Sequence, residues 1–457
     1  MQRLDRQSNG ITDGVIWKQL LKFFLPIMLG TFFQQLYNTV DAIVVGNFAG
    51  KEALAAVGGS ASRILDLVIG FFTGLASGAT VIVSQVYGAK DEQNVSRSVH
   101  TAMLLALGGG AIMTVIGLLI SPTLLVWMKT PPDTMAQSRD YVDIVFMAMI
   151  PGMVYNVGSA VLRAVGDSRR PLYFLISACM VNIVLDVLLV VGLEMGVAGA
   201  AIATIFSQAV SAVLVVITLL RSHQVYRLEP RKIRFYGNLL DRIVRIGFPA
   251  GLQSVMYSLS NIIIQASINA FGTDIVAAYT AYGKLDGLYW MMINAFGVSI
   301  TTFVGQNFGA GKYDRMRRSV RVCLLMTFGA TVLMSGFFLL LGEPLYRLFT
   351  DDAQVIALGM QILRLLVPTY VTYICIEVLA GAVRGTGDSL IPTLFTLTGV
   401  CLLRVAWVMG VAPAYHSLTV VLLSYPITWT ITSVLFVIYY LKGGWLKRSI
   451  SKAKLEA

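Results

Sequence analysis

Long apolar segments recur along the whole of this 457-residue chain, separated only by short polar or Gly- and Pro-containing turns. Hydrophobic residues make up 56% of the sequence and charged residues only 13%, a balance that no soluble core requires. A segment in lipid must satisfy its own backbone hydrogen bonds, and a helix of about 20 apolar residues does so. The sequence therefore predicts an all-α integral membrane protein. It excludes a cytosolic enzyme, a secreted disulfide scaffold and a nucleic-acid-binding protein.

The apolar runs and the turn residues between them predict twelve transmembrane helices. Several runs are longer than a bilayer needs, which indicates tilted or kinked helices. The expected ranges are 17–47, 53–86, 94–120, 135–162, 168–192, 197–220, 239–271, 275–307, 316–341, 354–383, 389–412 and 416–441.

The distribution of basic residues predicts how these helices are oriented. Of the 35 Lys and Arg residues, 27 fall on one side of the predicted topology, 4 on the other and 4 within spans. Basic loops stay in the cytoplasm, so both termini are expected there. The same rule accounts for the net charge of +11 and for the basic run from Arg227 to Arg234, which we interpret as an orienting linker rather than a ligand-binding patch.

An internal repeat divides the chain into two halves. Two separated windows match at one offset of 221 residues: Val83-Ser-Gln-Val-Tyr-Gly-Ala-Lys90 with Val304-Gly-Gln-Asn-Phe-Gly-Ala-Gly311, and Arg163-Ala-Val-Gly-Asp-Ser-Arg-Arg-Pro171 with Arg384-Gly-Thr-Gly-Asp-Ser-Leu-Ile-Pro392. Each half holds six spans, an even number, so both halves enter the membrane in the same direction. We therefore expect two six-helix bundles related by a pseudo-twofold axis along the membrane normal.

The repeat also predicts the domain organisation. The expected parts are a cytoplasmic N-terminal segment (1–16), an N-terminal six-helix lobe (17–221), a basic cytoplasmic linker (222–238), a C-terminal six-helix lobe (239–441) and a basic cytoplasmic tail (442–457). In both Gly-Asp-Ser motifs, glycine permits a turn, Asp or Ser can cap the next helix, and the proline falls in its first turn. We interpret these motifs as helix-helix turns without a direct chemical role.

Polar side chains inside the predicted spans are costly in lipid, so they mark candidate functional sites. Asn38 and Asp41 share one face of the first span, and Asn182 and Asp186 share a face of the fifth. Thr204 on the sixth span lies at a comparable depth. Two carboxylates close together in a low-dielectric bundle cannot both stay ionised cheaply, so such a pair tends to hold a proton. The same oxygens suit Na⁺, and a hydrogen-bonded polar cluster without a transport role is the alternative.

The chain resembles the multidrug and toxic compound extrusion (MATE) family over essentially its whole length. The resemblance is carried by Gln34-Gln-Leu-Tyr-Asn-Thr-Val-Asp41 in the first span, by the segments around Gln85 and Gln306, and by the paired Arg-x-x-Gly-Asp-Ser turns. It implies a V-shaped pair of bundles in the bacterial cytoplasmic membrane. It also implies an antiporter that exports amphipathic, typically cationic, compounds in exchange for H⁺ or Na⁺ by alternating access.

The resemblance also implies a cation site. In the family, an aspartate of span 1, an Asn-x-x-x-Asp of span 5 and a threonine of span 6 form the site of the N-terminal half. Asp41, Asn182, Asp186 and Thr204 match that pattern residue by residue, for H⁺ or for bound Na⁺.

A second acidic site, on spans 7 and 10 of some family members, is in doubt because span 7 here carries polar residues but no acid. Glu377 on span 10 is expected either to contact substrate or to be neutralised by Lys284 or Arg404. Polar and aromatic residues give the full set of substrate-cavity candidates: Gln34, Tyr37, Asn38, Tyr155, Asn156, Tyr257, Asn261 and Glu377.

The chain contains no Walker A motif, so an ion gradient rather than bound ATP is expected to drive transport, with no cofactor and a functional monomer. One alternative is a flippase for a lipid-linked saccharide, which needs a cationic cavity. The bases expected within spans keep that alternative open: Arg63, Lys284, Arg364 and Arg404. An intramembrane enzyme is disfavoured because the three histidines fall at membrane edges and no HExxH motif occurs.

Overall fold

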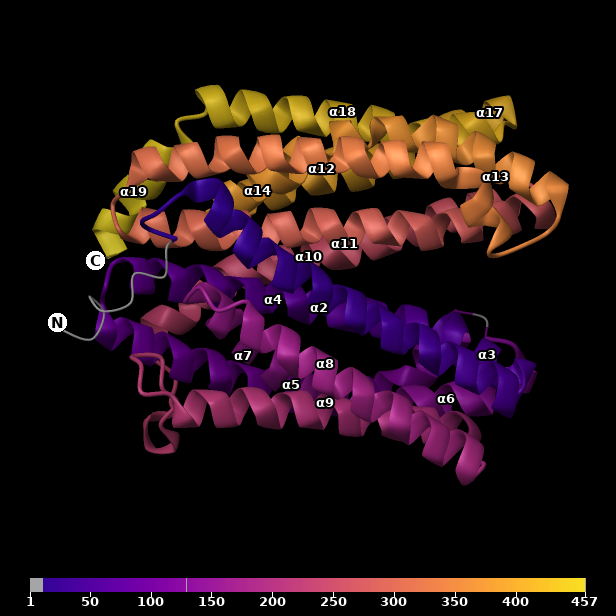
Figure 1. Cartoon of the computed structure of the whole chain (residues 1–457), viewed down its shortest axis with the longest axis horizontal. Helices are drawn as coiled ribbons and strands as arrows, with labels where there is room; N and C mark the ends of the chain where they lie inside the picture. The colour runs from indigo at the N-terminus through magenta and orange to yellow at the C-terminus, as the bar shows by residue number, and fades with distance from the viewer. Residues whose placement is uncertain (1–10, 129, 457) are drawn as a thin grey trace. The chain divides into compact units, whose positions relative to one another are not determined.

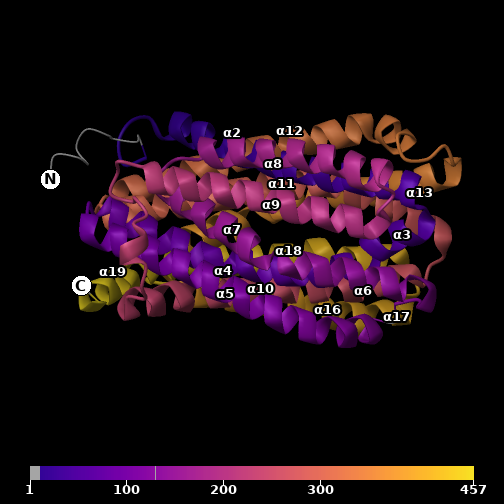
Figure 2. The same ribbon diagram turned by 90° about the horizontal axis from the view of Figure 1, so that it is seen from below.

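Helices of the predicted lengths dominate the computed structural model, which describes residues 11–128 and 130–456 (Figures 1 and 2). Contacts divide these residues into two units, one of residues 22–251 and one of residues 11–21 and 252–456. Two helices, α2 (Ile16–Val44) and α10 (Gly237–Asn269), begin in one unit and continue in the other.

The first unit contains most of α2 and the first part of α10. Its other helices are α3 (Lys51–Ala56), α4 (Ser62–Gly88), α5 (Glu92–Trp127), α6 (Pro132–Met147), α7 (Met149–Ala164), α8 (Arg169–Asp186) and α9 (Gly196–Arg221). Short π-helical segments continue three of them: Val45–Ala49 after α2, Val57–Ala61 after α3 and Val187–Gly192 after α8. The buried core lies where α4, α5, α7 and α9 pack together.

The second unit has the same helical character. Its helices are α11 (Thr273–Gly309), α12 (Tyr313–Arg347), α13 (Ala353–Leu366), α14 (Ile374–Gly385), α15 (Leu390–Thr396), α16 (Leu403–Ala406), α17 (Ala412–Tyr415), α18 (Leu418–Lys442) and α19 (Trp445–Glu456). A 3₁₀ segment (Val367–Thr372) joins α13 to α14, and π-helical segments (Leu397–Leu402 and Trp407–Val411) link α15, α16 and α17. α19 lies within the predicted tail, where the sequence analysis identified only basic character.

The prediction of an all-α membrane protein is confirmed. Among the described residues, ten helices are long and apolar enough to cross a membrane, or eleven if α6 and α7, which are bent by 49° at their junction, form one span. Every predicted span coincides with a helical stretch, but α10 is not one of the ten or eleven. The physical reason is composition, because α10 carries Asp, Arg, Gln and Asn along its length.

Glycines bring the backbones of α4 and α10 into contact within the first unit. A Cβ atom added to Gly247 would lie 2.5 Å from the carbonyl oxygen of Leu75, and one added to Gly251 would lie 2.6 Å from that of Phe71. On α4, Gly74 and Gly78 face the same crossing and leave equally little room. Each helix thus contributes a Gly-x-x-x-Gly pair, the pattern that allows close helix packing in membranes.

The repeated Gly-Asp-Ser turns have the predicted local structure. Gly166 and Gly387 both adopt φ = 96°, which a residue with a side chain rarely adopts. Asp167 caps α8 because its carboxylate accepts the backbone N–H groups of Arg169 and Arg170, each at 3.1 Å. The prediction that an acid of this motif caps the following helix is therefore confirmed.

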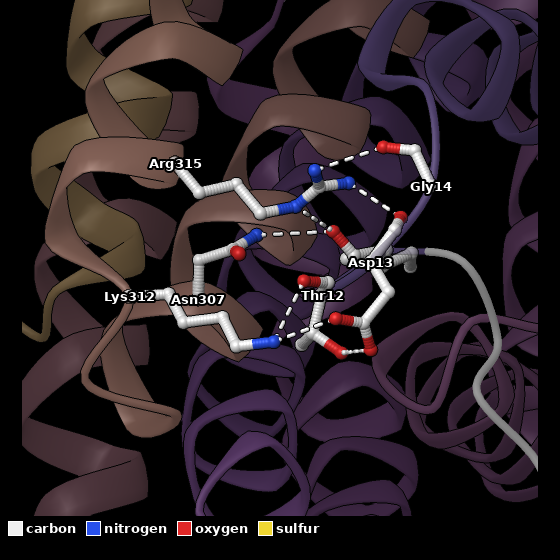
Figure 3. Close-up of polar contacts among 7 residues, drawn as sticks. Thr12, Asp13, Gly14, Asn307, Lys312 and Arg315 are labelled. Carbon is white, nitrogen blue, oxygen red and sulfur yellow. Dashed lines mark hydrogen bonds and ion pairs between the residues drawn. The ribbon is translucent and has the colours of Figure 1, made fainter.

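An N-terminal strap, residues 11–14, lies against the start of α12 and the end of α11 in the second unit (Figure 3). The side chain of Ile11 is 2% exposed. The Arg315 guanidinium donates to three backbone carbonyls of the strap, those of Ile11 (3.0 Å), Asp13 (2.6 Å) and Gly14 (2.9 Å). Asn307 donates a further hydrogen bond to the Ile11 carbonyl, so the segment before α2 is fastened by side chains far away in sequence.

Candidate functional site

The four residues of the predicted cation site are all buried in the first unit. Asp41 lies one turn before the end of α2 and is 5% exposed, and Thr204 on α9 is 8% exposed. Asn182 and Asp186, one turn apart on α8, are both fully buried. Burial of these four polar side chains costs free energy unless hydrogen bonds or bound ions replace the water that they lose.

The helical segments that carry these residues pack against one another. The π-helical segment Val45–Ala49, which follows Asp41, contacts both α9 and the π-helical segment Val187–Gly192, which follows Asp186. α8 and α9 also pack extensively along their lengths. The carboxylates of Asp41 and Asp186 interact electrostatically with each other, and the hydroxyl of Tyr141 on α6 interacts electrostatically with both. The helical segments that carry these residues therefore pack together, and a shared site for all four side chains stays a prediction.

Several polar atoms of this group have no hydrogen-bond partner among the described residues. They are Oδ1 of Asp41, both amide atoms of Asn182 and both carboxylate oxygens of Asp186. Thr204 donates its hydroxyl to the carbonyl of Ala200 at 3.1 Å, which leaves its oxygen lone pairs available. Buried polar atoms are normally paired, so these atoms make the group a candidate binding site.

A π-helical segment begins immediately after Asp186. Its wider hydrogen bonding appears in the 2.9 Å bond from Leu193 N–H to the carbonyl of Leu188, five residues back. Single π-helical turns in α-helices are frequent at functional sites, because they shift the helical register. At offset 221, Asp186 corresponds to Trp407, where another π-helical segment begins, so the two halves share this distortion.

The substrate-cavity candidates of the first unit differ in exposure. Tyr37, Tyr155 and Asn156 are half-buried, whereas Gln34 and Asn38 are exposed. Tyr37 interacts electrostatically with Asp41 and Tyr155, which places these three side chains in one neighbourhood. The Tyr155 hydroxyl donates to the carbonyl of Pro171 at 3.4 Å and so joins α7 to α8.

The candidates of the second unit form a separate group. The hydroxyls of Tyr257 and Tyr373 lie 2.9 Å apart, and Asn261 is exposed. Glu377 interacts with the Tyr373 hydroxyl and with the charge of Arg384. The two expectations for Glu377, contact with substrate or neutralisation by Lys284 or Arg404, stay predictions. Arg384 lies two turns further along the same helix.

Sequence reasoning missed one half-buried carboxylate with several partners, Asp286 on α11. It accepts hydrogen bonds from the Tyr370 hydroxyl at 2.6 Å, the Trp290 indole N–H at 2.8 Å and the Tyr282 hydroxyl at 3.1 Å. These donors satisfy an ionised carboxylate well. The position of Asp286 inside the eighth predicted span, two residues after Lys284, could have marked it as a candidate. No sequence pattern predicted that its hydrogen-bond partners would be aromatic residues.

Arg404 is held by aromatic rings rather than by an acid. Its guanidinium carbon lies 4.3 Å from the ring centre of Tyr425 and 5.8 Å from that of Trp429. Its N–H groups donate to the Thr428 hydroxyl at 3.3 and 3.4 Å. Cation–π contact of this kind stabilises a buried cation without neutralising it.

Long apolar helices around buried, unpartnered carboxylates are the features of a membrane transporter. The MatE family model matches the chain twice, over residues 26–188 and 249–409, in agreement with the internal repeat. The chain belongs to the MatE family, the MATE multidrug efflux transporters, and is therefore a transporter rather than an enzyme.

Individual relatives cover nearly the full chain. It is 27% identical over 449 residues to the Probable multidrug resistance protein YoeA of Bacillus subtilis (strain 168), covering 96% of each chain. It is 29% identical over 398 residues to the Probable multidrug resistance protein YpnP of the same organism, covering 87% of this chain and 89% of that protein. A structure described as an outward-facing multidrug resistance MATE family transporter matches with a TM-score of 0.87 and 23% identity, covering 98% of both chains.

Proposed function

We propose that this protein is a secondary active antiporter that exports amphipathic, cationic compounds in exchange for H⁺ or Na⁺ by alternating access. Asp41 and Asp186 carry the coupling ion, and Asn182 and Thr204 supply neutral oxygens. The observation that carries the proposal is the group of buried oxygen atoms on Asp41, Asn182 and Asp186 that lack partners among the described residues. Membership of a family of multidrug efflux transporters supports the class of substrate.

The two carboxylates give a simple chemical cycle. Two negative charges buried together repel each other and lose solvation, so binding one proton or one Na⁺ removes most of that cost. An ion entering from one side and leaving on the other would thus alternately relieve and restore the cost. The membrane potential contributes about 2.3 kcal/mol per charge for each 100 mV.

Several further features belong to the same proposal. The protein acts as a monomer in the bacterial cytoplasmic membrane, with both termini in the cytoplasm. Its two lobes each contribute six spans, joined by the linker 222–238, and the half-buried tyrosines Tyr37, Tyr155 and Tyr257 contact substrate. Positive loops on one side support this orientation.

The flippase alternative receives less support from the positions of the basic residues. Of the four bases expected within spans, Arg63, Lys284 and Arg364 are exposed, and only Arg404 is buried. Arg404 already contacts the rings of Tyr425 and Trp429. A cavity built to hold a pyrophosphate needs several convergent cations.

The decisive experiment is uptake of a fluorescent organic cation into proteoliposomes under a pH gradient or a Na⁺ gradient imposed separately. We expect one gradient to drive uptake in the native protein and neither to drive it in Asp41→Asn or Asp186→Asn. Asp140→Asn is the matched control, because Asp140 is an exposed acid in the same unit. Coupling that survives in both site variants would overturn the assignment.

A further inference from the structure

A cavity of about 480 Å³ lies in the first unit, where α8 begins and α9 ends. Basic side chains from two elements line it, namely Arg170 of α8, Arg221 at the end of α9 and His223 just after it. Neutral hydrogen-bonding side chains complete the polar part of the wall: Thr218, Ser222 and Gln224. A cavity with this lining is suited to an anion with several acceptor oxygens.

The positive charge of the cavity is only partly compensated. Arg170 pairs with Asp167, with the Nε atom 3.3 Å from the carboxylate, which leaves other N–H groups of its planar fork available. Arg221 is exposed, and no carboxylate within ion-pair distance is found for it in the described ranges. Of the two guanidinium groups that line the cavity, only that of Arg170 is paired with an acid among the described residues.

Exposed apolar side chains lead along both helices to the cavity. On α9, Phe206, Val213 and Ile217 are exposed, at spacings of seven and four residues that keep them on one face. Ile217 itself lines the cavity. On α8, Tyr173, Met180 and Val184 follow the same spacings and are also exposed.

The combination of a basic cavity and apolar stripes points to an amphiphile. Arg170 precedes Tyr173 by one turn, and Arg221 follows Ile217 by one turn, so each cation stands at the end of an apolar stripe. Each span ends here at the predicted membrane boundary, where phospholipid headgroups lie. Basic pockets between transmembrane helices at this level bind anionic headgroups.

We propose that the cavity between Arg170 and Arg221 binds the phosphate of an anionic phospholipid, with the acyl chains along the exposed faces of α8 and α9. The two guanidinium groups hold the phosphate oxygens. Ser222 and Gln224 donate to the remaining acceptors or to the polar headgroup.

Native mass spectrometry of the purified full-length protein tests this site directly. The protein in detergent is titrated with phosphatidylglycerol, with phosphatidylcholine, and with phosphatidylglycerol in the presence of inorganic phosphate. We expect phosphatidylglycerol to bind more tightly than phosphatidylcholine. The double variant Arg170→Gln/Arg221→Gln should lose about thirtyfold in affinity. Each basic residue near an anionic surface contributes about 1 kcal/mol, and the loss of about 2 kcal/mol corresponds to that factor.

Two further variants make the result specific. Arg231→Gln/Arg318→Gln removes the same charge from two exposed positions outside the cavity and should leave affinity unchanged. Arg170→Lys/Arg221→Lys should restore most of the binding, which separates loss of the site from loss of folding. Equal losses in the cavity variant and the control would overturn the site. Displacement of the lipid by millimolar inorganic phosphate would overturn the lipid assignment in favour of a free phosphate ion.

Discussion

Lys312 at the start of α12 fixes the N-terminal strap through Asp13, with 2.7 Å between its ammonium nitrogen and the carboxylate oxygen. The same ammonium donates to the carbonyl of Thr12 at 3.0 Å (Figure 3). Arg315, one turn further on, donates hydrogen bonds to the backbone carbonyls of Ile11, Asp13 and Gly14. Lys312 thus binds both the carboxylate and the backbone of the strap, and Arg315 fixes its backbone through three carbonyls.

These two contacts should contribute unequally to holding the strap. Arg315→Gln removes three hydrogen bonds from a charged donor, each contributing about 1.5–3 kcal/mol at most, so the strap should detach readily. Lys312→Gln removes an exposed ion pair that contributes less than about 1 kcal/mol. The measurement is maleimide labelling of Ile11→Cys, a buried position, in a background without the native cysteines. We expect the fastest labelling in Arg315→Gln.

Arg347→Gln is the control for this series, because Arg347 forms an exposed ion pair with Glu343 elsewhere on α12. Its labelling rate should equal that of the parent. A rate in Arg315→Gln no faster than in this control would contradict the role of the strap contacts.

The strap should also loosen in acid. The hydrogen bond from Lys312 lowers the pKa of Asp13 below its ordinary value of 3.8. A lowered carboxyl pKa stabilises the attached strap fully above that ordinary value, and the stabilisation disappears as pH falls through the lowered pKa. Hydrogen exchange of the strap should therefore differ between the native protein and Asp13→Asn at neutral pH. The two should converge well below pH 3.8. A difference that persists in acid would show that the carboxylate charge is not the cause.

A substitution at Thr204 should distinguish coupling to Na⁺ from coupling to H⁺. A proton is carried by the carboxylates, whereas Na⁺ also needs neutral oxygen ligands. Loss of one such ligand, at about 1–3 kcal/mol, weakens binding by roughly tenfold or more. We expect Thr204→Ala to raise the Na⁺ concentration for half-maximal transport by about tenfold and to leave proton-driven transport within about twofold. Thr204→Ser should retain both activities. A parallel fall of both in Thr204→Ala would instead indicate a structural hydroxyl.

The α4–α10 crossing should not tolerate a methyl group. A Cβ at Gly78 would meet the carbonyl oxygen of Ile243, a backbone atom that cannot move without separating the helices. We expect Gly78→Ala to destabilise the protein by about 1–3 kcal/mol, measured as a lower midpoint of thermal unfolding in detergent. Gly108→Ala in α5 meets open space and should be neutral or slightly stabilising. Equal midpoints for the two variants would refute the close crossing.

Local sequence patterns predicted the helices well because an apolar segment in lipid must satisfy its own backbone hydrogen bonds, and an α-helix does so. The expected span at 168–192, for example, corresponds to α8 and the π-helical segment that ends at Gly192. The expected span at 94–120 was too short, because α5 extends to Trp127 with Pro122 inside it. A helix in this environment continues past proline when neighbouring helices support it.

The placement of Asn182 and Asp186 on one face of α8 was predictable because they lie one turn apart, so the period of the helix places them together. Contacts between distant segments carry no such signal. The bond between Tyr370 and Asp286 joins residues 84 positions apart, and nothing in a single sequence connects them.

The glycine crossing also determines how α10 can move. Its first part has its backbone against α4 up to Gly251, so this part is anchored to the first unit. From Leu252 onward the same helix belongs to the second unit. Pro249 stands two residues before that boundary and removes one backbone hydrogen bond there. Because Gly247 and Gly251 on either side of Pro249 both pack against α4, we expect α10 to bend beyond Gly251 rather than at the proline or along its anchored part.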